Sequence, residues 1–227
     1  MNYTISKLCA WSGIAFTVLI GLGFAVLAGF LPPPAPSDTA AQTAQLFIEH
    51  KNGIRFGMIL MMFAGSINCI FVGAISTQLR RIETTNPMWT YAQLAAGCAG
   101  AVTIVIGAML MTAVAFRPDR SPDLMLLLFD LAWLMVVMPG TPAAVQNFTI
   151  GMAILSDKNS PTIFPRWLGF FNIWTALLFL PGALVTFFKT GPFAWNGLLA
   201  FWLPAALFGP WFFIMFFMMR KAIRQQA

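Results

Sequence analysis

The stretch Asp123–Leu155 reads DLMLLLFDLAWLMVVMPGTPAAVQNFTIGMAIL, and it decides the fold. It is apolar for long enough to cross a bilayer, which takes about 20 residues of helix, but the run from Met138 to Pro142 (MPGTP) interrupts it. Each flank of the interruption is shorter than one crossing, so two separate spans do not fit. Because proline removes a backbone donor and clashes with the preceding turn, we predict one spanning helix, kinked or broken at Pro139–Pro142.

The rest of the chain has the same apolar character. Hydrophobic residues make up 59% of it and charged residues only 9%, and the mean hydropathy is +0.79, whereas soluble domains carry about 25% charged residues. This composition predicts an all-α, polytopic transmembrane helix bundle that forms a single domain over residues 1–227. The expected spans cover residues 8–31, 55–79, 88–116, 123–155, 166–188 and 193–219, and a short surface helix is expected over 40–52.

The first apolar segment has an alternative interpretation, a cleaved signal peptide. Its apolar stretch is longer than the roughly 7–15 residues of a signal peptide's hydrophobic region. The cluster of Pro32, Pro33, Pro34 and Pro36 ends it, as proline ends a helix. These features favour a retained span.

Six spans place both termini on the same side, and the distribution of Lys and Arg predicts which side that is. Eight basic residues fall on the side of the termini and five on the other. The eight are Lys7, Arg80, Arg81, Lys158, Arg166, Arg220, Lys221 and Arg224, and the five are Lys51, Arg55, Arg117, Arg120 and Lys189. Because cytoplasmic loops are richer in Lys and Arg, we expect both termini in the cytoplasm.

Polar groups at membrane depth are the candidates for a ligand site, because a charge there is costly and a free backbone carbonyl must find a partner. Asp130 lies within the fourth span, and Lys189 leaves the fifth span on the same side. At 1.5 Å per residue, Asn147 and Asn172 lie roughly 12 and 9 Å from the cytoplasmic ends of their helices, so the two amides are expected at one level.

These features define a hypothetical ligand-binding site at the interrupted helix, with aromatic side chains as its walls. Its residues are Asp130, Trp133, Pro139, Gln146, Asn147, Asn172 and Trp174. The same residue types also serve structural roles, because amides hydrogen-bond across neighbouring helices and a paired or protonated aspartate ties helices together. Both interpretations are open at this stage.

The sequence offers little for catalysis, metal binding or nucleic-acid binding. It has one histidine, His50, and three cysteines without the spacing of metal ligands, and it has no nucleophile elbow or phosphate-binding glycine loop. We expect no catalytic residue, no metal and no cofactor. The net charge of +6 comes from basic residues that stand singly or in pairs between apolar blocks, so we expect no nucleic-acid partner.

Four strings resemble those of a family of small multi-pass bacterial membrane proteins without an assigned activity. They are Ala28–Pro34 (AGFLPPP), Ala115–Arg120 (AFRPDR), Phe164–Trp167 (FPRW) and Lys189–Gly197 (KTGPFAWNG). The resemblance extends over nearly the whole chain. It implies a bacterial inner membrane, and no functional residue can be carried over from it.

Three classes of function fit these observations. The first is a noncatalytic membrane protein that binds a hydrophobic small molecule or lipid, or that acts as an accessory subunit of a membrane complex. The second is a small proton-coupled permease for an apolar substrate, in which the fourth span changes shape and Asp130 carries the proton. The third is an intramembrane enzyme. The expected partners are the lipid bilayer, a hydrophobic small molecule and other membrane subunits.

Overall fold

The computed structural model describes residues 3–225, which are 78% helical overall and contain no strand. In chain order the helical elements are α1 (Tyr3–Ile20), the π-helical η1 (Gly21–Leu27), α2 (Ala40–Leu79), α3 (Met88–Phe116), α4 (Pro122–Val137), α5 (Gly140–Leu155), α6 (Arg166–Phe179), the 3-10 helix η2 (Leu180–Phe187), the π-helical η3 (Leu198–Trp202) and α7 (Leu203–Arg224). The predicted all-α bundle is therefore confirmed.

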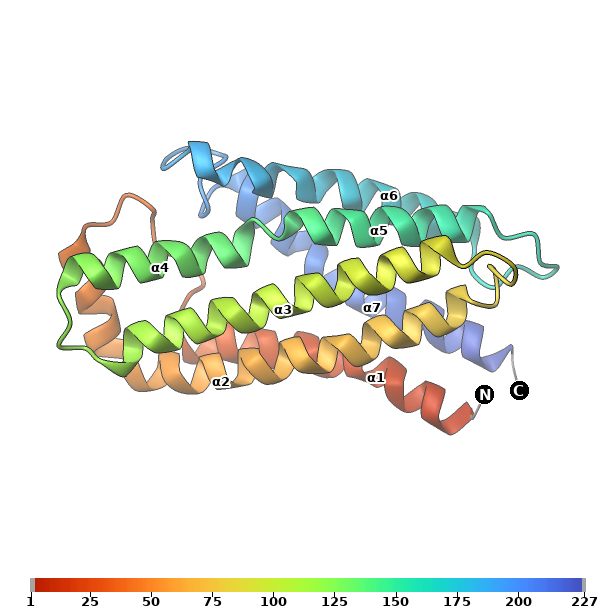
Figure 1. Ribbon diagram of the computed structural model, residues 1–227, viewed down its shortest axis with the longest axis horizontal. Helices are drawn as coiled ribbons and strands as arrows, with labels where there is room; N and C mark the ends of the chain where they lie inside the picture. The colour runs from red at the N-terminus through yellow and green to blue at the C-terminus, as the bar shows by residue number, and fades with distance from the viewer. Residues whose placement is uncertain (1–2, 226–227) are drawn as a thin grey trace.

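These elements combine into six helices that are long and apolar enough to cross a membrane, counted within the described residues. They are Tyr3–Leu27, Ala40–Leu79, Met88–Phe116, Pro122–Leu155, Arg166–Phe187 and Leu198–Arg224. They run side by side in one elongated bundle with both chain ends at one end of it, which we call the terminal end (Figure 1). The chain is a multi-pass membrane protein.

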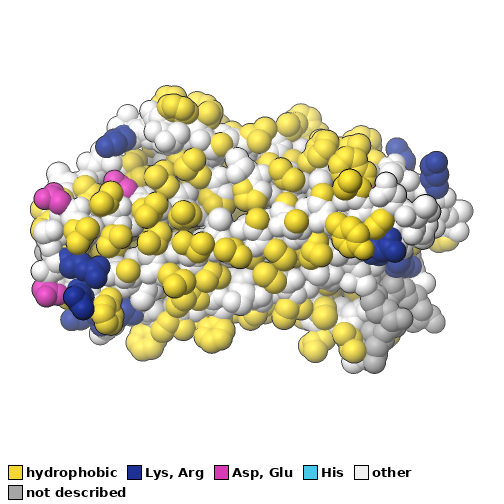
Figure 2. All heavy atoms as spheres, viewed as in Figure 1, with side chains coloured by type: hydrophobic (Ala, Val, Ile, Leu, Met, Phe, Trp, Pro, Cys, Tyr) yellow, Lys and Arg dark blue, Asp and Glu magenta, His cyan; other side chains and the backbone are white. Residues whose placement is uncertain are grey.

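The surface of the bundle fits a bilayer. On the face shown in Figure 2, hydrophobic side chains cover the long middle of the molecule, and the Lys, Arg, Asp and Glu side chains gather at its two ends. Large apolar side chains such as Leu8, Phe56 and Phe63 are more than half exposed. A soluble protein rarely exposes so continuous an apolar surface, but hydrocarbon covers it at no cost.

The expected surface helix over 40–52 is not a separate element, because α2 runs unbroken from Ala40 to Leu79. Thr39 and Gln42 form the capping box that starts it. Its first turns lie across the opposite end of the bundle (Figure 1), where the ring of Phe47 meets that of Phe129 in α4 edge-on at 5.2 Å. The predicted boundary at Asn52 is therefore wrong.

Both boundaries of the first and sixth spans also differ from the sequence prediction, the first span ending at Leu27 rather than at 31 and the sixth at Arg224 rather than at 219. The first span begins at Tyr3 rather than near residue 8, and the sixth begins at Leu198 rather than at 193. The residues between η2 and η3 form turns, held by hydrogen bonds such as Gly197 N to Ala194 O at 2.7 Å. Lys7 and Tyr3 are polar ends on an otherwise apolar helix, so hydropathy alone places the start too late.

The fourth span is broken where the prolines predicted. The α4 helix ends at Val137 and α5 begins at Gly140, with Met138 and Pro139 between them. The fifth span changes from α-helix to 3-10 helix at Leu180, beside Pro181. The two irregular points pack against each other.

Candidate functional site

The break in the fourth span is closed by backbone packing. A Cβ atom on Gly140 would lie 2.5 Å from the carbonyl oxygen of Phe179, and a Cβ atom on Gly182 would lie 2.9 Å from that of Val137. Only glycine allows these two backbone segments to approach each other this closely. The amide of Thr141 donates to the Met138 carbonyl at 3.2 Å, so that freed carbonyl also has a partner. Protein, rather than an open pocket, covers the backbone around Pro139.

A buried group of amides lies between α2, α3 and α5, in the half of the bundle nearer the terminal end. Gln93 is fully buried, and its Nε2 donates to the Val72 carbonyl at 3.2 Å and to the Ser76 hydroxyl. Gln146 Nε2 donates to Gln93 Oε1 across a long 3.5 Å contact. The predicted site residue Gln146 therefore belongs to a hydrogen-bonded chain that ties three helices together.

Sequence reasoning missed Gln93, which is the centre of this amide group. The signal was present, since Gln93 is the one amide side chain in the apolar stretch Met88–Phe116. An amide in such a stretch needs a partner on a neighbouring helix.

The structure gives Asn147 and Asn172 different partners, and no hydrogen bond joins the two. Asn172 is fully buried, and its Oδ1 accepts from Trp211 Nε1 at 3.0 Å, which links α6 to α7. Asn147 Nδ2 donates to the Ala143 carbonyl of its own helix at 2.8 Å. Its Oδ1 is buried without a partner, as is that of Asn68 in α2. The two amides that were expected at one level therefore do not hydrogen-bond to each other.

Trp133 is buried in an aromatic cluster in the other half of the bundle. Its ring stacks on that of Trp195 at 6.0 Å with an interplanar angle of 12°, and it meets Phe24 and Phe30 at 5.6 and 5.9 Å. Trp195 Nε1 donates to the Pro34 carbonyl at 2.8 Å, which ties the two loops of this end together. Trp133 is fully covered by protein rings, so it is a core residue.

Asp130 and Trp174 lie apart from both groups. Asp130 is half-buried on α4, and its electrostatic partner is Lys189, just beyond η2. Trp174 is 64% exposed, so it faces outward from α6 and lines no interior space. The seven predicted residues thus do not form one pocket. They divide between the break, the amide group, the aromatic cluster and the surface.

Two hollows in the surface lie elsewhere, near the terminal end. The larger one, which we call the α1/α2 groove, has a volume of about 250 Å³ and is mostly apolar. It is lined by Ile5, Ser6, Cys9, Ile70, Gly73, Ala74, Thr77, Gln78 and Met219. The smaller one has about 180 Å³ and lies between the loop before α6 and the last turns of α7.

Arg81 holds the terminal end together beside this groove. Its Nη1 donates to Gln78 Oε1 and to the Ala222 carbonyl, both at 2.8 Å, so it ties the end of α2 to α7. Burial lowers the pKa of Arg81 from its ordinary value, and the carboxylate of Asp157 opposes that shift. Asp157 itself is fixed by the amides of Asn159 and Ile163 at 2.9 and 2.7 Å.

Neither the placement of metal-binding side chains nor similarity to known proteins points to a chemical activity. Among the described residues, no group of three or more His, Cys, Asp or Glu side chains is placed to hold a metal ion. No family model, curated protein or solved structure matches this chain.

Proposed function

We propose that this chain is a noncatalytic protein of a bacterial inner membrane that binds a hydrophobic small molecule or lipid in the α1/α2 groove. The observation that carries the proposal is the groove itself, which is apolar, about 250 Å³ in volume and half-open along the side of the bundle. The break at Pro139, by contrast, is packed against Phe179. A ligand enters the groove sideways from the bilayer, without any opening of the bundle.

The proposed orientation has both termini in the cytoplasm. It rests on the excess of Lys and Arg at the terminal end, eight against five by the sequence positions. A reporter that is active only in the periplasm, fused after Arg224, should be silent, and the same reporter placed after Asp119 should be active. The reverse pattern would overturn the orientation.

Gly73 provides the test of the groove. A Cβ atom added there meets nothing within 4 Å, so Gly73→Leu fills the groove without a clash at the backbone. Gly100 in α3 is equally open, and Gly100→Leu is the matched control. We expect native mass spectrometry of protein extracted from phosphatidylcholine nanodiscs to show one retained lipid on the wild type and on Gly100→Leu, and none on Gly73→Leu.

Two results would contradict the proposal. Equal lipid retention by Gly73→Leu and the wild type would place the bound lipid outside the groove. Purification with partner chains in a fixed ratio, together with Gly73→Leu releasing those chains, would instead favour an accessory subunit that uses the groove as its docking face.

One observation favours the second candidate, a proton-coupled permease. The irregular helical segments η1, η2 and η3 and the break before Gly140 all lie in the half of the bundle away from the termini. Discontinuous helices of this kind line the substrate sites of many transporters. In proteoliposomes that accumulate an apolar dye, Asp130→Asn should abolish the dependence of uptake on a pH gradient, and Asp123→Asn should not. Uptake that is unchanged by Asp130→Asn would remove this candidate.

A further inference from the structure

The lining of the α1/α2 groove changes from apolar to polar along its length. On α2, Ile70 and Gly73 lie on the membrane side and Thr77 and Gln78 lie near the terminal end, over roughly 12 Å of helix at 1.5 Å per residue. On α1, Cys9 lies deeper, and Ser6 lies nearer the same end beside the apolar Ile5. The groove therefore suits a molecule with an apolar tail and a polar head, and the head belongs at the terminal end.

The size of the groove favours a chain over a compact ligand. Pockets for small molecules usually hold about 300–1,000 Å³ and enclose most of their ligand, whereas this groove has about 250 Å³ and is partly open. A single acyl chain needs only a narrow slot and leaves its outer side in the bilayer. The exposed flanks, with Leu8 72% and Ile70 50% exposed, provide apolar contact for the rest of such a lipid.

Basic side chains gather where the polar head would lie. Lys7 follows the lining residue Ser6, and Arg220 follows the lining residue Met219. Lys7, Arg220 and Arg224 all interact electrostatically with the Tyr3 hydroxyl, and Lys7 Nζ lies 4.2 Å from the centre of the Tyr3 ring. Positive charge from α1 and α7 is thus concentrated beside one tyrosine.

These cations lack acidic partners. Neither Tyr3–Leu27 nor Leu198–Arg224 contains an Asp or Glu, and no ion pair to Lys7, Arg220 or Arg224 occurs among residues 3–225. Two acidic residues near the terminal end, Glu83 and Asp157, are engaged elsewhere: Glu83 accepts from the Thr90 amide at 2.7 Å and Asp157 accepts from the Ile163 amide. The cluster is therefore open to an external anion.

We infer that the α1/α2 groove binds one acyl chain of an anionic phospholipid, whose phosphate lies among Lys7, Arg220 and Arg224. The inference rests on the proposed function and names the class of its ligand. Charge complementarity decides against a zwitterionic lipid, whose choline would meet the same three cations. The Ser6 and Thr77 hydroxyls line the transition between chain and headgroup.

The experiment uses the full chain in nanodiscs of equimolar dioleoylphosphatidylglycerol and dioleoylphosphatidylcholine, with retained lipids identified by native mass spectrometry after mild detergent extraction. We expect at least tenfold preference for phosphatidylglycerol. Each basic residue near an anionic headgroup contributes roughly a fivefold change in affinity. The triple variant Lys7→Gln, Arg220→Gln, Arg224→Gln should therefore lose the preference and retain the two lipids in equal amounts.

A matched control removes charge at the opposite end, as Arg117→Gln with Lys189→Gln, and should keep the full preference. Arg224 is exposed, so the single variant Arg224→Gln tests the headgroup contact without any risk to folding and should weaken the preference roughly fivefold. Raising the salt concentration should weaken it as well, because exposed charges are screened.

The outcomes separate the headgroup inference from the proposed function. Equal retention of both lipids by the wild type, with loss of both in Gly73→Leu, would overturn the anionic headgroup and leave the groove as a hydrophobic site. Unchanged retention of both lipids in Gly73→Leu would overturn the groove and the inference together. A preference that survives the triple variant would show that other cations hold the phosphate and would overturn the assignment of Lys7, Arg220 and Arg224.

Discussion

Gly140→Ala is the most direct test of how the fourth span is broken. The added Cβ would lie 2.5 Å from the Phe179 carbonyl oxygen, closer than nonbonded atoms can approach. The clashing atom belongs to the backbone of α6, so no side-chain rotation relieves it. Either α5 moves away from α6 or the start of α5 is distorted, and both weaken the packing.

The expected change in the free energy of unfolding of Gly140→Ala is the sum of two opposed contributions. Overpacking in a filled interior costs about 1–3 kcal/mol. Replacing glycine by alanine inside a helix returns up to about 1 kcal/mol, but Gly140 is the first residue of α5, where less of this gain applies. We expect a net loss of about 1–2 kcal/mol in the free energy of unfolding.

The assay is unfolding of purified protein by sodium dodecyl sulfate in dodecyl maltoside micelles, followed by circular dichroism. Gly100→Ala is the control, because its Cβ meets nothing within 4 Å in the interior of α3. It should be neutral or stabilising by up to about 1 kcal/mol. A Gly140→Ala protein as stable as Gly100→Ala would refute the close approach of α5 and α6, and with it the claim that protein fills the break.

Three further predictions use the same assay. In a double-mutant cycle with Asn172→Leu and Trp211→Phe, the coupling energy should be about 0.6 kcal/mol and at most about 1.7 kcal/mol, as for other hydrogen bonds between membrane helices; additive effects would mean that the bond does not form. Gln93→Leu should cost about 1–2 kcal/mol, because it leaves the buried Gln146 Nε2 donor without its acceptor and removes the bonds to Val72 and Ser76, and a neutral result would show that the amide group does not tie the helices together. Arg55→Gln removes the guanidinium that donates to the Ala115 carbonyl at 2.8 Å at the end of α3, so it should cost about 0.5–1 kcal/mol, whereas Arg55→Lys should restore part of that loss; equal losses in the two variants would argue against a charge effect.

The spans could be predicted from the sequence because one physical quantity, apolar length, decides them. The break before Gly140 followed from Pro139 and Pro142 for a similarly local reason. The unbroken course of α2 could not be predicted. Asn52 and Gly53 resemble a helix boundary, but Gly53 is needed for close approach to the Leu27 carbonyl, a contact made only in the folded bundle.

The candidate site was harder to predict because the position of a side chain in a bundle depends on two things: its depth along the helix and the rotation of the helix about its axis. Asn147 and Asn172 were placed at one level from the helix rise alone. Whether they meet also depends on how each helix is rotated about its axis, and that rotation directs Asn172 toward Trp211 and leaves Asn147 on its own Ala143. Trp174 faces outward for the same reason.

The groove had no signal in the sequence. Its lining combines positions from α1, α2 and the last turns of α7, and none of these residues is unusual in an apolar helix. It exists because Gly73 and Ala74 leave space that no neighbouring helix fills. A groove that depends on small side chains and on the arrangement of three separate segments can be recognised only when the packing is known.

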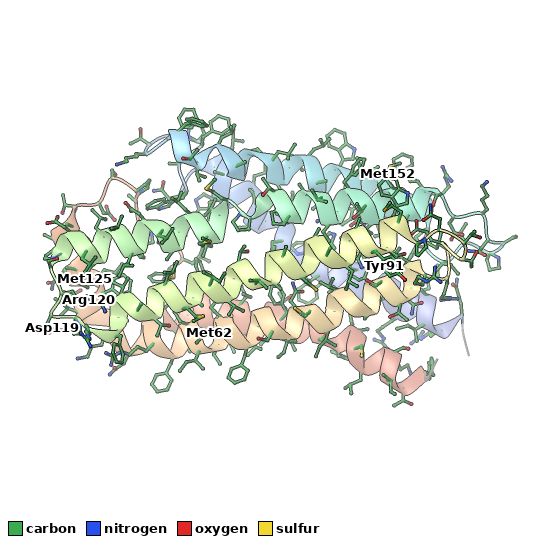
Figure 3. All side chains as sticks on the ribbon, viewed as in Figure 1. Met62, Tyr91, Asp119, Arg120, Met125 and Met152 are labelled. Atoms are coloured by element: carbon green, nitrogen blue, oxygen red, sulfur yellow. The ribbon has the colours of Figure 1, made fainter. Side chains whose placement is uncertain are left out.

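The end of α3 is held by two arginines, and this arrangement has a consequence for biogenesis. Arg120 donates to the Ala113 carbonyl at 2.9 Å from the loop at the opposite end (Figure 3), and Arg55 donates to the carbonyls of Ala115 and Phe116. Arg55 begins the second apolar stretch, yet its acceptors are synthesised some 60 residues later. A lone second helix would have to enter the membrane with that guanidinium unsatisfied, at a cost. We therefore expect the second and third helices to enter the membrane most favourably as a pair, as one antiparallel hairpin.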